Sequence, residues 1–83
     1  MSAPEKAFGN LIRKIRQEKG LSQEALALEA GLDRTFISLL ERGSRQPSLT
    51  TIFKIAKVLG ISASTLISKV ESSLSLNHDG VDL

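Results

Sequence analysis

Polar side chains open the second of two short helical patterns between Ser22 and Leu49. The first pattern closes at Gly31, and the second begins with Arg34 and Thr35, where a core helix would continue with apolar residues. An arginine guanidinium can donate two parallel hydrogen bonds to guanine O6 and N7, and threonine offers a hydroxyl and a methyl group to base edges. A helix that begins in this way is typical of one that is presented to DNA.

The residue types that other chemistries require are scarce. The chain has no cysteine and one histidine, His78, which excludes disulfides, thiolate metal sites and a zinc site. Glu24 and Glu29 fall on a predicted helix surface without further ligand residues beside them, and the glycines are dispersed rather than gathered in a phosphate loop. We therefore expect no enzyme activity, no metal, no cofactor and no small-molecule ligand.

Charge is unevenly distributed, although the net charge is only +2. Residues 1–60 carry ten Lys or Arg against six Asp or Glu, whereas residues 61–83 carry one against three. The helical body is therefore basic, and a basic face favours a polyanionic partner through counterion release. On charge alone, an ordinary solvated surface fits equally well.

The length of 83 residues and the mean hydropathy of +0.01 predict one small domain. A domain of this size buries only about 60% of the surface of its unfolded chain, so a second subunit often adds stability. No apolar run approaches the roughly 20 residues of a membrane span, and the N-terminus lacks the apolar segment of a signal peptide. We expect a cytoplasmic, nucleoid-associated protein without membrane contact.

Glycine, proline and serine divide the chain into five predicted helices and no strands, so the predicted fold class is all-α. The expected N-caps are Ser22, Asp33, Ser48 and Ser62. The predicted helices cover about residues 5–19, 23–30, 34–42, 49–59 and 63–72. These helices form one domain over residues 5–72, and residues 73–83 are expected to form a flexible tail. The predicted core stripes consist of Phe8, Ile12, Ile15, Leu26, Ala30, Ile37, Leu40, Ile52, Ile55, Ala56, Leu59, Leu66 and Ile67.

Three ordered segments, IRKIRQEKGLSQEALALEAGL, ISLLERGSRQPSL and IAKVLGIS, resemble the Cro/C1-type helix-turn-helix family, also called the XRE family. The resemblance covers about residues 7–68 and implies a five-helix lambda-repressor-like DNA-binding domain of bacterial or phage origin. Within the family, the string DRTFIS is most similar to the small controller proteins of restriction-modification systems.

The resemblance also implies which residues contact DNA. The N-terminal part of the recognition helix enters the major groove, which assigns base contacts to Arg34, Thr35, Ser38 and Leu39. Phosphate contacts fall to Gln23, Arg42, Ser44 and Arg45. Alternatives remain open: Arg34 as a solvated side chain paired with an acidic neighbour, Leu39 as rim packing, and the arginines after the helix as a charged loop. Phe36 is expected to be partly packed.

Two further positions are expected to be structural. The resemblance pairs Arg16 with Glu41 as a partly buried salt bridge between the first helix and the end of the third. Loss of one partner of such a pair commonly costs about 3–5 kcal/mol, so weaker DNA binding after such a substitution would reflect misfolding.

A single recognition helix reads only a few base pairs, so useful specificity predicts a homodimer on palindromic double-stranded DNA, with half-sites roughly 34 Å apart. Candidate interface residues are Phe53, Leu66, Val70 and Leu74, with the alternative that Phe53 and Leu66 belong to the core. The expected function is a sequence-specific dimeric transcription regulator of the controller-protein or phage-repressor type. An antitoxin, or a protein-interaction module that does not read DNA, remains as an alternative.

Overall fold

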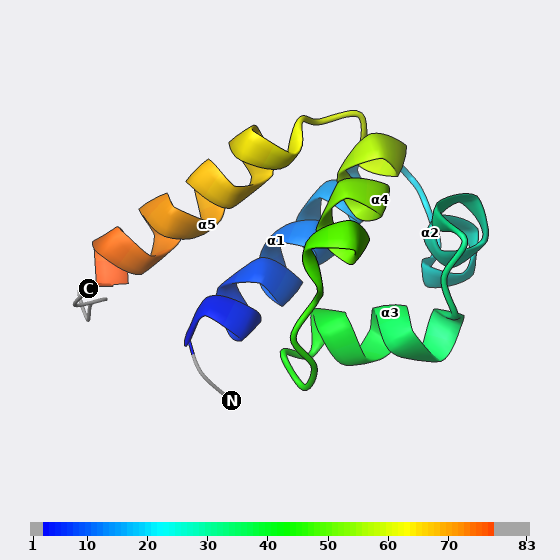
Figure 1. Cartoon of the computed structure of the whole chain (residues 1–83), viewed down its shortest axis with the longest axis horizontal. Coiled ribbons are helices and arrows are strands. Elements are labelled where there is room, and N and C mark those ends of the chain that lie inside the picture. The colour runs from blue at the N-terminus through cyan, green and yellow to red at the C-terminus, as the bar shows by residue number, and fades with distance from the viewer. Residues whose placement is uncertain (1–2, 78–83) are drawn as a thin grey trace.

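The structure, a computed structural model, describes residues 3–77 and contains five helices and no strand over that range (Figure 1). The helices are α1 (Ala3–Glu18), α2 (Gln23–Ala30), α3 (Arg34–Glu41), α4 (Leu49–Leu59) and α5 (Ala63–Asn77). The all-α prediction is confirmed. His78 and the predicted tail from residue 78 onward lie outside the described residues.

Local side-chain chemistry explains where the inner helices begin. Ser22, Asp33 and Ser48 are the N-caps of α2, α3 and α4, and each accepts a hydrogen bond from a backbone amide of the first turn. At the other end, Gly31 and Gly60 follow α2 and α4 with φ of 70° and 71°, in the left-handed region that glycine adopts without a Cβ penalty. The boundaries of α2 and α4 are therefore those predicted.

The outer helices are longer than predicted. Helix α1 begins at Ala3, so Pro4 lies in its first turn. Proline is tolerated there, because the amides of the first turn have no acceptor within the helix. Helix α5 continues to Asn77 instead of ending near Ser72. Leu74 packs partly buried against the core cluster, which extends the apolar contact of α5 by one further turn beyond Val70. The segment 73–77 is therefore helical, which corrects the predicted start of the tail.

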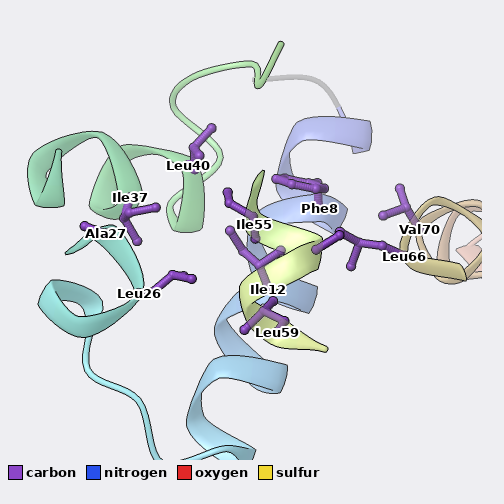
Figure 2. Close-up of a cluster of buried hydrophobic side chains, with 11 residues drawn as sticks. Phe8, Ile12, Leu26, Ala27, Ile37, Leu40, Ile55, Leu59, Leu66 and Val70 are labelled. Atoms are coloured by element: carbon purple, nitrogen blue, oxygen red, sulfur yellow. The ribbon is translucent and has the colours of Figure 1, made fainter. Parts of the chain in front are cut away.

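One core unites all five helices, as the side chains in Figure 2 show. Helix α5 packs against both α1 and α4 and runs alongside α1 (Figure 1). Seven large side chains are fully buried: Ile12, Leu26, Ile37, Leu40, Ile55, Leu59 and Leu66. Ile15 and Ile52 are only partly buried, and Ile67 is 43% exposed, so the prediction that Ile67 closes the core is wrong.

The backbones of α1 and α3 approach closely at Gly9, which is buried. A Cβ atom at this position would lie 2.7 Å from the Glu41 carbonyl oxygen and would also collide with the Leu40 carbonyl oxygen. Only glycine fits here without a shift of backbone. This contact fixes the C-terminal end of α3 against α1, and the sequence pattern did not reveal it.

Among the described residues, no single helix is both long and apolar enough to cross a membrane. Helices α4 and α5 meet those criteria only as a combined pair, and the pair is bent by 103°. No group of three or more potential metal-ligating side chains occurs among the described residues.

Candidate nucleic-acid interface

Helix α3 lies at one edge of the molecule, with one face turned to the core and the other free (Figure 1). Ile37 and Leu40 are fully buried and hold the inner face. Arg34 and Thr35 are exposed at the start of the helix, whereas Ser38 and Leu39 are half-buried one turn later. The four residues predicted to contact bases therefore form one accessible strip along α3, with its most polar end at the N-terminus.

The N-terminus of α2 lies beside this strip. Arg34 shares a shallow surface depression with Arg16 on α1 and with Ser22, Gln23 and Glu24 at the start of α2. The first amides of a helix have no intrahelical acceptor and carry partial positive charge, so they suit an anion such as phosphate. The structure thus brings a predicted base-reading arginine next to a predicted phosphate site.

A buried ion pair joins α1 to the end of α3. The Arg16 Nε donates to Glu41 Oε2 at 2.6 Å, and a second guanidinium nitrogen donates to Glu41 Oε1 at 3.0 Å. The side chains of Arg16 and Glu41 are 10% and 2% exposed. Arg16 also donates to the Leu21 carbonyl oxygen at 2.7 Å, just before α2. The Arg16–Glu41 pair that the resemblance implied is present, and Arg16 also connects it to the backbone of the turn before α2.

Gln23 completes this network. Its Nε2 donates to Glu41 Oε1 at 3.0 Å, so one carboxylate accepts hydrogen bonds from both α1 and α2. One of the two side-chain N–H groups of Gln23 is therefore engaged within the protein, and among the described side chains the other N–H has no acceptor. The residues alone did not suggest this contact, because Gln23 and Glu41 are 18 positions apart.

The loop after α3 turns sharply at Gly43, whose φ is 75°. The Gly43 amide donates to the Leu40 carbonyl at 3.0 Å, and the Ser44 amide donates to the Leu39 carbonyl at 2.9 Å. Arg42, Ser44 and Arg45, the predicted phosphate contacts of this loop, are all exposed. The loop therefore presents two guanidinium groups beyond the C-terminal end of the strip on α3 formed by Arg34, Thr35, Ser38 and Leu39, which is called the recognition strip.

A second, apolar surface lies on α4 and α5. Leu49 and Phe53, one turn apart on α4, are 69% and 58% exposed, and Ile67 on α5 is 43% exposed. Beside them is an indentation lined by Phe8, Pro47, Ile52, Ile67 and Val70, among other residues. Together with the half-buried Leu74, these three exposed side chains form the α4–α5 apolar surface.

Two of the predicted interface residues do not belong to the α4–α5 apolar surface. Leu66 is fully buried and Val70 is 8% exposed, because α5 turns these side chains toward Phe8 on α1 (Figure 2). Their assignment to an interface between subunits is wrong, and they are core residues. Leu49 and Ile67, which were not predicted, are exposed instead. For Leu49 the signal was available, since it lies one turn before Phe53 and outside the core stripe of α4.

Comparisons with known proteins agree with this geometry. Residues 12–66 match the family model described as helix-turn-helix. The chain is similar to the control protein C.MunI from Mycoplasma sp, with 48% identity over 65 residues that cover 77% of this chain and 88% of C.MunI.

Solved structures are similar as well. The restriction-modification controller protein C.AhdI from Aeromonas hydrophila superposes with a TM-score of 0.76 at 45% identity, covering 78% of this chain and 98% of C.AhdI. A point variant of the controller protein C.Esp1396I, bound to its highest-affinity operator site, superposes with a TM-score of 0.81 at 36% identity, covering 89% of this chain and 97% of the variant.

The matched region contains α2, α3 and the turn between them, which are the elements that carry the recognition strip. The family match covers more than half of the chain, and the identity to C.MunI extends over most of both proteins. The chain therefore belongs to the XRE-type helix-turn-helix family of DNA-binding transcription regulators.

Proposed function

We propose that this protein is a transcription regulator of the controller-protein type, which binds a palindromic operator as a homodimer and inserts α3 into the major groove. One observation carries the proposal. The exposed, polar start of α3 lies beside the N-terminus of α2, and the buried carboxylate of Glu41 at the end of α3 accepts hydrogen bonds from both Arg16 on α1 and Gln23 on α2.

Base reading falls to the strip on α3. Arg34 is exposed at the first position of α3, on the side that faces the start of α2. Its side chain can therefore extend into the major groove of a bound duplex. A bidentate contact from arginine to guanine contributes about 1–3 kcal/mol of discrimination. Thr35 offers a hydroxyl and a methyl group, Ser38 a hydroxyl, and Leu39 an apolar surface for a thymine methyl group.

Phosphate contacts flank the strip at both ends. At one end are the free amides of α2 together with the second side-chain N–H of Gln23. At the other end are Arg42, Ser44 and Arg45 in the loop after α3. Contacts on both sides fix the register of a helix on the duplex, while the bases between them supply the specificity.

The α4–α5 apolar surface supports pairing with a second copy of the chain. Leu49, Phe53 and Ile67 are large hydrophobic side chains that are exposed on the two adjacent helices α4 and α5, and exposed apolar surface of this kind is typical of an interaction site. Palindromic recognition requires a two-fold axis that places two α3 helices on one duplex, and we assign the subunit contact to this surface. The similarity to controller proteins supports this type of regulator over the phage-repressor type.

Selection of duplexes from a random-sequence pool tests the proposal. The wild-type protein should enrich a symmetric site whose half-sites are separated by about one helical turn or a multiple of it. Binding without sequence preference would contradict the proposal and would favour a module that does not read DNA. Enrichment of an asymmetric single site would contradict the dimer alone.

A further inference from the structure

The Arg45 side chain lies over the aromatic ring of Phe36, with the guanidinium carbon 5.7 Å from the ring centroid. This distance is within the range of about 6 Å over which the face of a ring attracts a cation. Phe36 is the third residue of α3, and Arg45 belongs to the loop that follows the helix. The contact therefore connects the predicted base-reading helix directly to the predicted phosphate-binding loop.

The backbone at Gly43 brings Arg45 back along α3. With φ at 75°, the chain reverses there, and amides of the loop close onto the carbonyls of Leu39 and Leu40. Gly43 also packs against α1, since a Cβ atom added to it would lie 2.8 Å from the Lys6 Cγ. The start of the loop is therefore anchored on two sides, and its direction toward Phe36 is set by the fold.

The two partners differ in how firmly they are held. The Phe36 ring is half-buried and packs against the core cluster, so its position follows that of α3. The Arg45 side chain is exposed, and within residues 3–74, whose side chains are described, no hydrogen bond or ion pair holds its guanidinium. The ring of Phe36 is thus the contact that restrains the arginine.

We propose that Phe36 is a positioning residue that orders Arg45 for phosphate contact before DNA binds. A ring covers only the flat face of a guanidinium, and the N–H donors lie in its plane at the edge, where they remain available to phosphate oxygens. Restricting a long side chain in advance reduces the conformational entropy that is lost on binding. The inference rests on the proposed role of Arg45 as a phosphate contact.

A measurement without DNA tests the contact itself. In the NMR spectrum of the wild-type protein, the δ-methylene protons of Arg45 should be shifted upfield by the ring current of Phe36. Phe36→Leu should return them to the position of an ordinary solvated arginine, and the control Phe36→Tyr, which keeps the ring, should leave them shifted. Unchanged shifts in Phe36→Leu would overturn the proposal whether or not the protein binds DNA.

Binding measurements then test the function of the contact. On a duplex that the wild-type protein has selected from a random pool, Phe36→Leu should weaken binding about two- to tenfold, because the arginine side chain must then be ordered when DNA binds. Introduced together with Arg45→Ala, Phe36→Leu should cause no further loss. Introduced together with the matched control Arg42→Ala, it should cause the full loss.

An equal loss from Phe36→Leu in the Arg45→Ala and Arg42→Ala proteins would show that the ring acts independently of Arg45 and would overturn the proposal. If Phe36→Leu lowers the thermal midpoint so far that the domain unfolds, Arg45→Lys replaces it, because lysine keeps the charge without the planar face. Arg45→Lys should weaken binding to a similar extent, and wild-type affinity in that variant would be the overturning result. If the wild-type protein enriches no duplex at all, the proposed function fails, and the NMR result still decides the contact.

Discussion

Arg34 and Arg45 are chemically identical side chains in different surroundings. Arg34 begins a helix and shares a depression with the N-terminus of α2, whereas Arg45 belongs to a loop and lies against an aromatic ring. A position on the recognition strip is suited to reading a base edge, and a position on the flanking loop is suited to the continuous line of phosphates. Surroundings, rather than residue type, separate the two proposed roles.

Alanine substitutions at these two arginines should therefore differ in kind. Arg34→Ala should relax specificity at one base position of each half-site, with a loss of about 1–3 kcal/mol on the best site. Arg45→Ala should weaken binding to all duplexes and reduce the slope of log affinity against log salt by about one. Binding to matched and mismatched duplexes over a salt series measures both effects. Identical behaviour of the two variants would contradict the division of roles.

The Glu41 side chain carries a charge that is buried at the junction of α1, α2 and α3. It is almost fully buried and accepts hydrogen bonds from Arg16 and Gln23, so its removal leaves an arginine charge without a partner. Glu41→Ala should lower the free energy of unfolding by about 3–5 kcal/mol, as for other broken buried pairs. Urea denaturation measures the change. Glu24→Ala, which removes an exposed carboxylate on α2, is the control, and a loss as small as that of the control would contradict a supporting role for the pair.

At the scale of helices, the position of α3 depends on its contacts at both ends. Its N-terminal half is held through Ile37 in the core, and its C-terminal end is held by the Glu41 network and by the close crossing with α1 at Gly9. A recognition helix must be oriented within narrow limits to align several side chains with base edges. The α1–α3 crossing thus helps to orient α3, although it contains no predicted DNA contact.

Gly9→Ala at the α1–α3 crossing changes helix propensity and packing in opposite directions, so its net effect on stability shows which of the two is larger. Gly9→Ala improves the intrinsic preference of α1 for helix by up to about 1 kcal/mol, but its Cβ atom meets backbone carbonyls of α3 that cannot rotate away. We expect a net destabilisation of about 1–3 kcal/mol in thermal or denaturant unfolding. Asn10→Ala, at the exposed neighbouring position of α1, should be neutral or slightly stabilising. A stabilised Gly9→Ala protein would contradict the close crossing.

For the molecule as a whole, two surfaces have different chemistry. The recognition strip and its flanking loop are polar and basic, whereas the α4–α5 apolar surface exposes large hydrophobic side chains. A single small domain offers too few base contacts for a unique genomic site, and a two-fold dimer doubles them. The proposed dimer would therefore serve two purposes. It would bury apolar surface that a small domain leaves exposed, and it would double the number of base contacts.

Substitution of Phe53 tests this surface without disturbing the core, because its side chain is 58% exposed in the single chain. Phe53→Glu should yield a folded monomer in sedimentation velocity, since it places a charge in the centre of the proposed contact. Leu28→Glu, at an 80% exposed leucine on α2, should remain a dimer. An unchanged dimer in Phe53→Glu would exclude this residue from the interface, and a wild-type monomer at all concentrations would contradict the dimer.

The predictions that succeeded depend on local chemistry. Ser22, Asp33 and Ser48 satisfy the first amides of the helices that follow them, and these bonds join residues only two or three positions apart. Such interactions can be recognised in the sequence without knowledge of the fold. The same holds for the polar start of α3, which interrupts an otherwise apolar pattern. Sequence-based interpretation therefore identified α2, α3 and the polar start of α3.

Contacts between distant residues required the tertiary structure. Helix α5 carries Leu66, Ile67 and Val70 on adjoining faces, so periodicity permits more than one orientation, and only its packing against α1 buries Leu66 and Val70 and leaves Ile67 exposed. The sequence by itself determined where α2, α3 and α4 begin and that the start of α3 is polar, because caps and polarity are local properties. The tertiary structure alone decided the crossing at Gly9, the hydrogen bond from Gln23 to Glu41 and the pairing of Phe36 with Arg45. Each of these depends on how whole helices pack, and no short segment of sequence contains that information.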